Sequence, residues 1–384
     1  MTHPLVITGV IYLAGLGAAG QFSKLAVSFV ALTELYHGRE ATLGLTVSLI
    51  SLVGVVLGLV AGMVVNRIGA RRALIWALAF GAAISAWQVS LPALPTLMAS
   101  RILEGLSHLL IVVAAPTLIS EMTPDRLRPA ALTLWSTFFG VAFALTALIA
   151  PGLITFGGLS ALLAAHGVWM ALACGLCVAV LPKPETQQDF AQPPGSVFAR
   201  HLRAYATPGI AAPALAWLCY TLTFVSVLTV LPLLTGPTDA VWLASLAPLV
   251  SISVALTAGI FLLNRIRALP IVIWGFFACL VASTLALAAD FSPLSILILF
   301  AAMAFVQGSG FAVVPQLNPD PNARALANGA LAQMGNVGNL AGTPLLIAIY
   351  QGAPTFGPFV FLAVAYAGGL CLTWIIGRRA MAAL

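Results

Sequence analysis

Three charged side chains, Lys24, Arg101 and Glu104, stand inside long apolar stretches of the sequence. A charge in the hydrocarbon of a membrane is expensive and usually faces a cavity or a partner, so each is a candidate functional residue. With a rise of about 1.5 Å per helical residue, all three are expected at a similar depth, toward the outer ends of their helices. We therefore expect them to meet in one layer of the protein.

Two cations and one carboxylate leave one surplus positive charge, which would attract an anionic substrate such as a carboxylate. In this interpretation Lys24 and Arg101 bind the substrate, and Glu104 orients one cation through a charge-assisted hydrogen bond. Two alternatives stay open at this point. The three residues would instead serve in coupling or gating, or they would form a purely structural ion pair between helices.

Glu104 is also the only carboxylate placed clearly inside the membrane, which makes it the leading candidate for proton coupling. His108 follows it at i+4, one helical turn further on, and would share a proton relay with it. The alternative for His108 is an ordinary packing residue held by a hydrogen bond.

Neutral polar and aromatic residues are the remaining candidates for a substrate site. They would hydrogen-bond the substrate, or alternatively they would hold helices together. Glycines at 335, 338 and 342 favour the second interpretation for the amides near them. The substrate-site candidates are Tyr12, Gln21, Trp135, Tyr220, Thr223, Gln307, Gln333 and Asn336.

The overall composition is that of a polytopic membrane protein. Of the 384 residues, 61% are hydrophobic and only 7% are charged, and the mean hydropathy is +1.08. A soluble domain carries far more charge on its surface. The net charge of +6 is not the footprint of a nucleic-acid-binding protein, because the basic residues are spread over short loops between apolar runs.

The sequence contains no motif of an enzyme or of a cofactor site. A glycine-rich phosphate loop with its lysine is missing, so ATP is not expected to drive this protein directly. The five cysteines all fall in apolar runs, where packing is their expected role. We expect a non-enzymatic monomer in the lipid bilayer that uses no metal or cofactor.

Twelve apolar runs are long enough to cross a bilayer, which takes about 20 residues. The expected spans are 5–33, 42–65, 73–91, 96–120, 130–155, 160–181, 209–234, 240–263, 269–289, 293–314, 326–350 and 358–377.

The distribution of basic residues predicts the orientation of these spans. With both termini in the cytoplasm, 13 of the 16 Lys and Arg residues fall in cytoplasmic loops or tails, and only Arg39 falls in an outer loop. Cytoplasmic loops carry such an excess of positive charge in membrane proteins. An even number of spans and cytoplasmic termini are therefore expected.

The two halves of the chain look like copies of one unit. Asn66-Arg67-Ile68 matches Asn264-Arg265-Ile266 at an offset of 198, and Pro124-Asp125 matches Pro319-Asp320 at an offset of 195. A duplicated six-helix unit is typical of transporters that hold the substrate between their halves. We expect a first bundle at 1–181, a cytoplasmic linker at 182–208 and a second bundle at 209–384. Within the linker, Val197–Tyr205 is basic and amphipathic and would lie on the membrane surface.

The loop Gly62-MVV-Asn66-Arg67-I-Gly69-A-Arg71-Arg72 resembles the signature G-xxx-D-R-x-G-R-R-R that follows span two in the major facilitator superfamily. Arg101-IL-Glu104-Gly105 is similar to the arginine motif of span four in that family. The resemblance covers the whole chain. It implies an all-α membrane protein with twelve transmembrane helices in two pseudo-symmetric six-helix bundles. It also implies that spans one, four, seven and ten line a central cavity.

The same resemblance implies a gating role for the loops on the cytoplasmic side. The residues concerned are Gly62, Asn66, Arg67, Gly69, Arg71, Arg72, Asn264 and Arg265. The family's acidic residue is Asn66 in this chain, and an amide contributes no charge to the latch that the carboxylate helps to form. The latch is therefore expected to be weaker than in other members.

From these observations we expect a secondary active transporter of the inner (plasma) membrane that works by alternating access. Its substrate would be a small solute, an organic anion or carboxylate, with protons as the coupling ion. An exporter of hydrophobic or cationic compounds is the first alternative. It is less favoured because span five departs from the glycine–proline pattern of drug/proton antiporters. A non-transporting membrane receptor or assembly protein is the second alternative.

Overall fold

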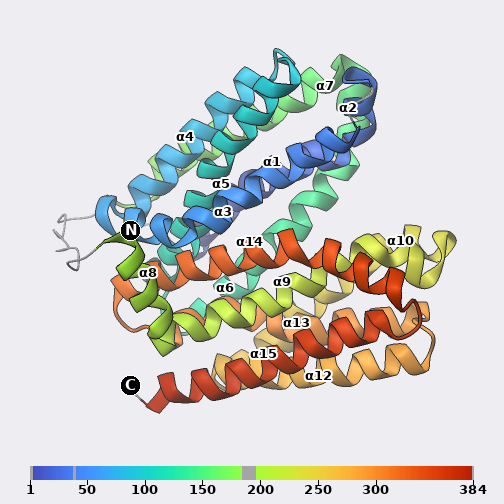
Figure 1. Cartoon of the computed structure of the whole chain (residues 1–384). Helices are drawn as coiled ribbons and strands as arrows, with labels where there is room; N and C mark the ends of the chain where they lie inside the picture. Colours follow the sequence, from blue (N-terminus) through green and yellow to red (C-terminus); the bar gives the residue numbers. More distant parts are fainter. Residues whose placement is uncertain (1–2, 38–39, 184–195, 383–384) are drawn as a thin grey trace. The chain divides into compact units, whose positions relative to one another are not determined.

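The computed structural model describes residues 3–37, 40–183 and 196–382, and these ranges contain helices and no strand (Figure 1). The first half contains α1 (Pro4–Val27), α2 (Phe29–Leu35), α3 (Glu40–Ile68), α4 (Ala70–Gln88), α5 (Leu94–Met122), α6 (Arg128–Ser136) and α7 (Phe138–Val180). The second half contains α8 (Val197–Ala206), α9 (Pro208–Thr235), α10 (Pro237–Val254), the π-helical turn η1 (Ala255–Gly259), α11 (Ile260–Leu263), α12 (Ala268–Ala288), α13 (Pro293–Leu317), α14 (Pro321–Gly352) and α15 (Gly357–Ala382).

The helices account for the twelve expected membrane crossings. Nine helical segments of the described ranges are long and apolar enough to span a bilayer. One of them is α7, whose 43 residues contain a sharp break at Gly157 and Gly158 and so form two crossings. Gly158 has φ 68°, a left-handed conformation that favours glycine. Counting the two parts of α7 separately and adding α4 and α14 gives the twelve expected crossings.

The turn between α3 and α4 is shorter than the sequence indicated. The expected spans left seven residues between them, but α3 continues to Ile68 and α4 begins at Ala70. Gly69 alone makes the turn, with φ 84°. Its backbone N–H still donates to the carbonyl of Val65, so α3 is hydrogen-bonded up to the turn.

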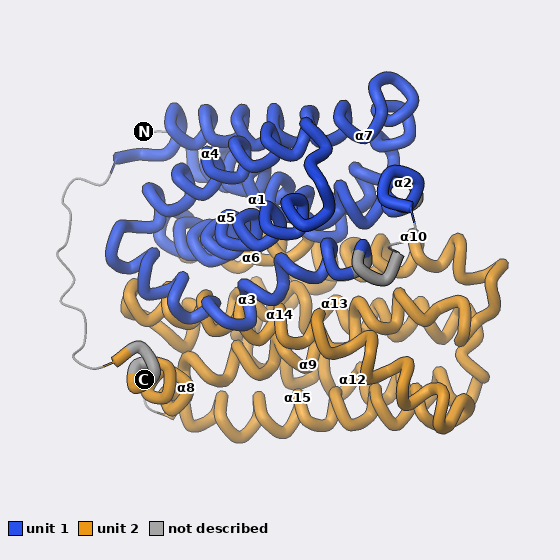
Figure 2. The backbone as a smooth tube through the Cα atoms, turned by 45° about the horizontal axis from the view of Figure 1, so that its top comes forward, with its two compact units in different colours: residues 1–124, 138–194 blue, residues 125–137, 195–384 orange. Residues whose placement is uncertain are grey.

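The chain forms two compact units (Figure 2). Unit 1 contains residues Met1–Pro124 and Phe138–Pro194, and unit 2 contains Asp125–Thr137 and Gly195–Leu384. Helix α6 therefore belongs to unit 2, where it packs against α13, η1 and α11. The bundle boundaries expected at 182 and 208 stay a prediction.

Equivalent helices pack in the same way inside each unit. In unit 1, α1 and α4 each pack against both α5 and α7. In unit 2, α9 and α12 each pack against both α13 and α15. This repeated arrangement is what the duplicated sequence pattern predicts, because each copy pairs its helices in the same way.

Helices α9 and α14 of unit 2 pack closely together, and glycines make the approach possible. A Cβ atom built on Gly338 would lie 2.7 Å from the backbone nitrogen of Leu222, and one built on Gly342 would collide with the backbone carbonyl oxygen of Leu222. Small residues four apart allow helix backbones to meet in lipid, where packing rather than hydrophobicity drives association. The amide-rich segment of α14 therefore contributes to helix packing.

Replacing Gly342 by Ala tests this packing. We expect Gly342→Ala to lower the free energy of unfolding by about 1–3 kcal/mol, because the methyl group forces the two backbones apart. Gly352→Ala in the same helix is the matched control, since a Cβ atom there meets nothing within 4 Å. Thermal unfolding of the purified variants measures both effects. Equal stability of the two variants would contradict the close approach.

Candidate functional site

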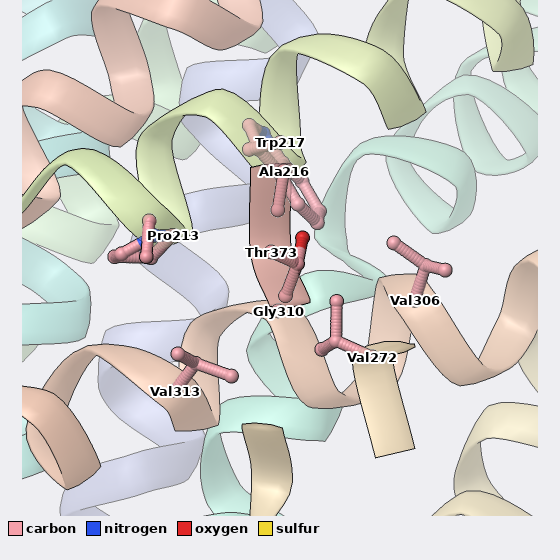
Figure 3. Close-up of a pocket in the computed structure, with 9 residues that line it drawn as sticks. Pro213, Ala216, Trp217, Val272, Val306, Gly310, Val313 and Thr373 are labelled. Carbon is pink, nitrogen blue, oxygen red and sulfur yellow. The ribbon is translucent and has the colours of Figure 1, made fainter. Parts of the chain in front are cut away.

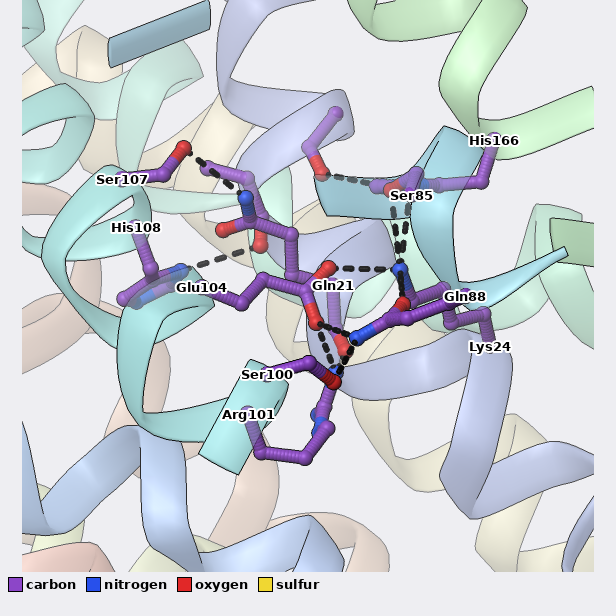
Figure 4. Close-up of polar contacts among 12 residues, drawn as sticks. Gln21, Lys24, Ser85, Gln88, Ser100, Arg101, Glu104, Ser107, His108 and His166 are labelled. Carbon is purple, nitrogen blue, oxygen red and sulfur yellow. Dashed lines mark hydrogen bonds and ion pairs between the residues drawn. The ribbon is translucent and has the colours of Figure 1, made fainter. Parts of the chain in front are cut away.

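Glu104 on α5 binds two cations at once inside unit 1 (Figure 4). Lys24 Nζ on α1 lies 2.5 Å from Glu104 Oε1, and the Arg101 guanidinium pairs with Glu104 Oε2. Arg101 and Glu104 are three residues apart on α5, so they share one face of that helix. All three side chains are at most 1% exposed. The structure thus brings together the three charges that the sequence singled out.

The ammonium group of Lys24 is saturated by protein acceptors. Besides Glu104, it donates to Gln88 Oε1 at 2.7 Å and to Ser85 Oγ at 3.0 Å. An ammonium has three hydrogens to donate, and three acceptors take them. An anionic substrate would therefore have to displace one of these bonds before it could contact Lys24.

The guanidinium of Arg101 ties α5 to two further helices. Its Nε donates to the backbone carbonyl of Thr46 on α3 at 2.9 Å, and Nη2 donates to the carbonyl of Gln21 on α1 at 2.8 Å. Glu104 Oε2 accepts a further bond from Gln88 Nε2 at 3.0 Å. The carboxylate thus lies among donors from α1, α4 and α5.

His166 brings a further helix, α7, to the site, where it lies beside Ser85 and Lys24. Its Nε2 lies 2.9 Å from the carbonyl of Gly17, which accepts hydrogen bonds only, so Nε2 carries a proton. Its Nδ1 lies 2.8 Å from Ser85 Oγ and 3.4 Å from Lys24 Nζ. A second proton on Nδ1 would face the ammonium group. The geometry therefore favours neutral His166, with Nδ1 as an acceptor.

A glycine on α1 makes room for this histidine. A Cβ atom on Gly20 would lie 2.8 Å from His166 Cδ2, closer than such atoms are normally found. Ser85, Gln88 and His166 belong to the site although the sequence alone did not point to them. Ser85 and Gln88 are polar residues three apart in an apolar helix, and this spacing is the signal that would have identified one of the site's faces.

Two other candidates of unit 1, His108 and Gln21, lie next to this group. His108 is hydrogen-bonded to a backbone carbonyl, and Gln21 is hydrogen-bonded to a serine side chain. His108 Nδ1 lies 2.9 Å from the carbonyl of Ala18, and its ring meets that of Phe22 edge to face. Gln21 donates from Nε2 to Ser107 Oγ at 2.9 Å. The expected relay between His108 and Glu104 is thus not formed by a direct hydrogen bond here. Tyr12 on α1 is half-buried.

In unit 2, Trp135 and Gln307 lie where α6 meets α13. Gln307 Oε1 accepts from Ser251 Oγ at 2.8 Å, and its Nε2 donates to the carbonyl of Ser136 at 3.1 Å. Trp135 is fully buried and meets Phe311 edge to face, with ring centroids 6.4 Å apart. Both side chains therefore hold α6 in place.

The remaining substrate-site candidates of unit 2 are buried or hydrogen-bonded to their own helix or to a neighbouring one. Thr223 donates to the carbonyl of Tyr220 at 2.9 Å, and Tyr220 is itself buried. Asn336 donates to the carbonyl of Ala332, one turn earlier in α14, at 2.7 Å. Gln333 accepts a hydrogen bond from Tyr205 on α8 at 2.7 Å. Their role in binding a substrate stays a prediction.

The expected gating residues differ in their surroundings. Arg71 donates to the carbonyls of Leu181 and Val178 at 3.0 and 3.1 Å, so it caps the end of α7. Arg265 lies over the ring of Phe261, 3.6 Å from its centroid. Gly62 is buried, Asn66 is half-buried, and Arg67, Arg72 and Asn264 are exposed. Their gating role stays a prediction.

A small cavity inside unit 2 is too narrow for a substrate (Figure 3). It lies between α9, α12, α13 and α15 and has ≈ 10 Å³ of free space. Trp217, Val306 and Gly310 are among its largely apolar lining, together with the hydroxyl-bearing Thr373. A single water needs about 10–15 Å³ and two or more polar partners, so the cavity belongs to the packing of the bundle.

Comparison with solved structures shows the fold. The proton:xylose symporter XylE has a TM-score of 0.76 at 16% identity, over 98% of this chain and 96% of that one. The E. coli fucose:proton symporter FucP has a TM-score of 0.76 at 14% identity, over 97% and 98%. The human organic anion transporter MFSD10 has a TM-score of 0.75 at 16% identity, over 98% and 100%.

Comparison with sequences shows the family. No curated protein matches the chain. The sequence model of the Major Facilitator Superfamily, however, matches residues 11–343, which is most of the chain. The loop motif, the duplicated halves, the helical fold and this match agree, and the chain belongs to the Major Facilitator Superfamily of membrane transporters.

Proposed function

We propose that this transporter moves a small solute across the inner membrane by proton-coupled alternating access, with Glu104 as the coupling group. The observation that carries the proposal is the sharing of one buried carboxylate between Lys24 and Arg101. Among the side chains that the structure describes, Glu104 is the only buried carboxylate. Two of the solved neighbours, XylE and FucP, are described as proton symporters.

The arrangement makes proton binding and helix contacts mutually exclusive. A proton on Glu104 removes the only negative charge of the group and leaves Lys24 and Arg101 without a counter-charge. Leaving a buried charge uncompensated is strongly unfavourable, so the contacts between α1, α4 and α5 would have to rearrange. A change in the protonation of one residue is thereby converted into a change in helix packing, which alternating access requires.

An organic anion is the substrate class that the charge of this group favours. Lys24, Arg101 and Glu104 leave one surplus positive charge. Because every hydrogen of the ammonium is already donated, we propose that the surplus acts through its field or after rearrangement of the group. MFSD10, described as an organic anion transporter, shares the fold.

Glu104→Gln tests the coupling. We expect the variant to lose proton-driven accumulation of substrate while it retains exchange between internal and external substrate, because the amide cannot exchange a proton with the solution. Uptake and counterflow by proteoliposomes, with and without an imposed pH gradient, measure the two activities. Glu121→Gln is the matched control, since Glu121 is an exposed carboxylate near the end of the same helix. Gradient-driven uptake that persists in Glu104→Gln would remove Glu104 from the mechanism.

The stability of charge variants tests the shared carboxylate. Glu104→Gln leaves two uncompensated cations and should lower the free energy of unfolding by about 3–5 kcal/mol. Lys24→Met leaves the neutral pair of Arg101 and Glu104 and should cost less. The double variant Lys24→Met/Glu104→Gln leaves one cation, so it should be more stable than Glu104→Gln alone. Thermal unfolding gives this order, and a double variant no more stable than Glu104→Gln would refute it.

A substrate panel tests the anion assignment. Proteoliposomes containing the wild-type protein should take up monocarboxylates or dicarboxylates in preference to hexoses and organic cations. We expect Lys24→Met to weaken carboxylate binding about tenfold, the equivalent of one charge-assisted interaction of roughly 1.5 kcal/mol. Competition by unlabelled compounds measures this affinity. Transport of hexoses or cations with no competition by carboxylates would overturn the assignment of an anionic substrate. The proposal of proton coupling through Glu104 would be unaffected, because Glu104→Gln tests it separately.

A further inference from the structure

A second, larger cavity lies at the loop end of the helices of unit 2. It has a volume of ≈ 230 Å³ and is open to the outside. The start of α6, the segment between α11 and α12, and the end of α13 line it. Its polar side chains are Asp125, Arg128, Arg267 and Gln316, and the rest of its lining is apolar. None of the residues expected to bind substrate contributes to it.

The cavity carries a surplus of positive charge. Arg128 Nη2 pairs with Asp125 Oδ1 at 2.7 Å, and this carboxylate is 90% exposed whereas the arginine is only 21% exposed. Arg267 is exposed and brings a second guanidinium to the same cavity. Two arginines and one aspartate leave one positive charge. Arginine matches phosphate particularly well, because its planar fork donates two parallel hydrogen bonds.

The guanidinium groups, rather than the start of α12, are placed to bind an anion. Gln316 Oε1 already accepts the backbone N–H of Leu269, at 3.0 Å, in the first turn of α12. The next residue is Pro270, which has no N–H to offer. The peptide donors of this helix start are therefore largely used, and the side chains must provide the binding.

The apolar lining indicates that the anion carries a hydrophobic part. Leu132, Leu263 and Ala312 line the cavity together with proline and isoleucine side chains. Ile266, which lines the cavity, is 46% exposed, and Phe261 on α11 is 55% exposed, as expected for helix ends that meet lipid. A soluble phosphate would leave this apolar surface in contact with water, whereas the glycerol and upper acyl region of a lipid would cover it.

We propose that this cavity binds a phosphate group, presented by an anionic phospholipid whose head group lies between Arg128 and Arg267. Arg128 is the first residue of α6, and Arg267 immediately precedes α12. A bound lipid therefore connects α6 to α12 and α13. The lipid stabilises the packed position of α6, which Gln307 and Trp135 also hold.

The test uses the purified full-length chain in a neutral detergent. Thermal unfolding is measured with added phosphatidylglycerol, phosphatidylcholine or glycerol phosphate. Phosphatidylglycerol should raise the unfolding temperature in a saturable way, and phosphatidylcholine should not. Arg267→Gln and Arg128→Gln should each weaken the apparent affinity about tenfold, because each removes a charge-assisted contact with phosphate. Arg265→Gln is the matched control, since Arg265 carries the same charge two residues away but stacks on Phe261 and does not line the cavity.

Ala312→Phe distinguishes the two sources of phosphate. The larger side chain would fill the apolar part of the cavity, so it should abolish stabilisation by the lipid. Glycerol phosphate alone should not stabilise the wild-type protein, because it lacks the apolar part that covers the lining. Stabilisation by glycerol phosphate that depends on Arg267 and survives in Ala312→Phe would assign the site to a soluble phosphate ester. Equal losses in Arg267→Gln and Arg265→Gln, or equal stabilisation by phosphatidylcholine, would overturn the proposal.

Discussion

The structure of unit 1 depends on one buried carboxylate that pairs with two buried cations. Glu104 joins Lys24 of α1 to Arg101 of its own helix. Gln88 and Ser85 of α4 accept the other two hydrogen bonds of the Lys24 ammonium, and Gln88 also donates to Glu104. Each charge is stable in the interior only because the others are present. The free energy lost when an ion leaves water must be offset by its interactions with these partners. The positions of three helices are thus linked to a single ionisable group, and this link is the physical basis of the proposed coupling.

The two copies of the duplicated unit solve the same packing problem with different chemistry. Ser85 in α4 corresponds to Ser283 in α12 at the offset of 198 seen in the loops, whereas Arg101 and Glu104 correspond to Leu299 and Ala302. Both of those residues are buried and apolar. Glycine contacts between α9 and α14, and aromatic rings along α9, hold unit 2 together. The buried charges that the proposed coupling requires are thus found in the first copy, whereas the corresponding positions of the second copy are apolar.

Helix α6 belongs by sequence to the first half and by packing to the second. Thr133 donates to the carbonyl of Gly308 at 2.8 Å, and Gln307 donates to that of Ser136. Beside them, η1 interrupts the regular helix between α10 and α11, and such π-turns are frequent at functional sites. The phosphate site proposed at Arg128 and Arg267 lies at the start of α6. Lipid binding and helix position would in this way be coupled.

The sequence alone determined the class of the protein, the twelve crossings and the duplication, because apolar length and charge placement act locally along the chain. It also identified Lys24, Arg101 and Glu104, since any charge in an apolar run is conspicuous. Only the tertiary structure decided what surrounds them. Ser85, Gln88 and His166 come from helices far apart in sequence, and an apolar stretch does not reveal which of its faces meets another helix. For the same reason the sequence did not predict that α6 packs in unit 2 or that His108 is hydrogen-bonded to the carbonyl of Ala18. Both depend on neighbours that folding brings close.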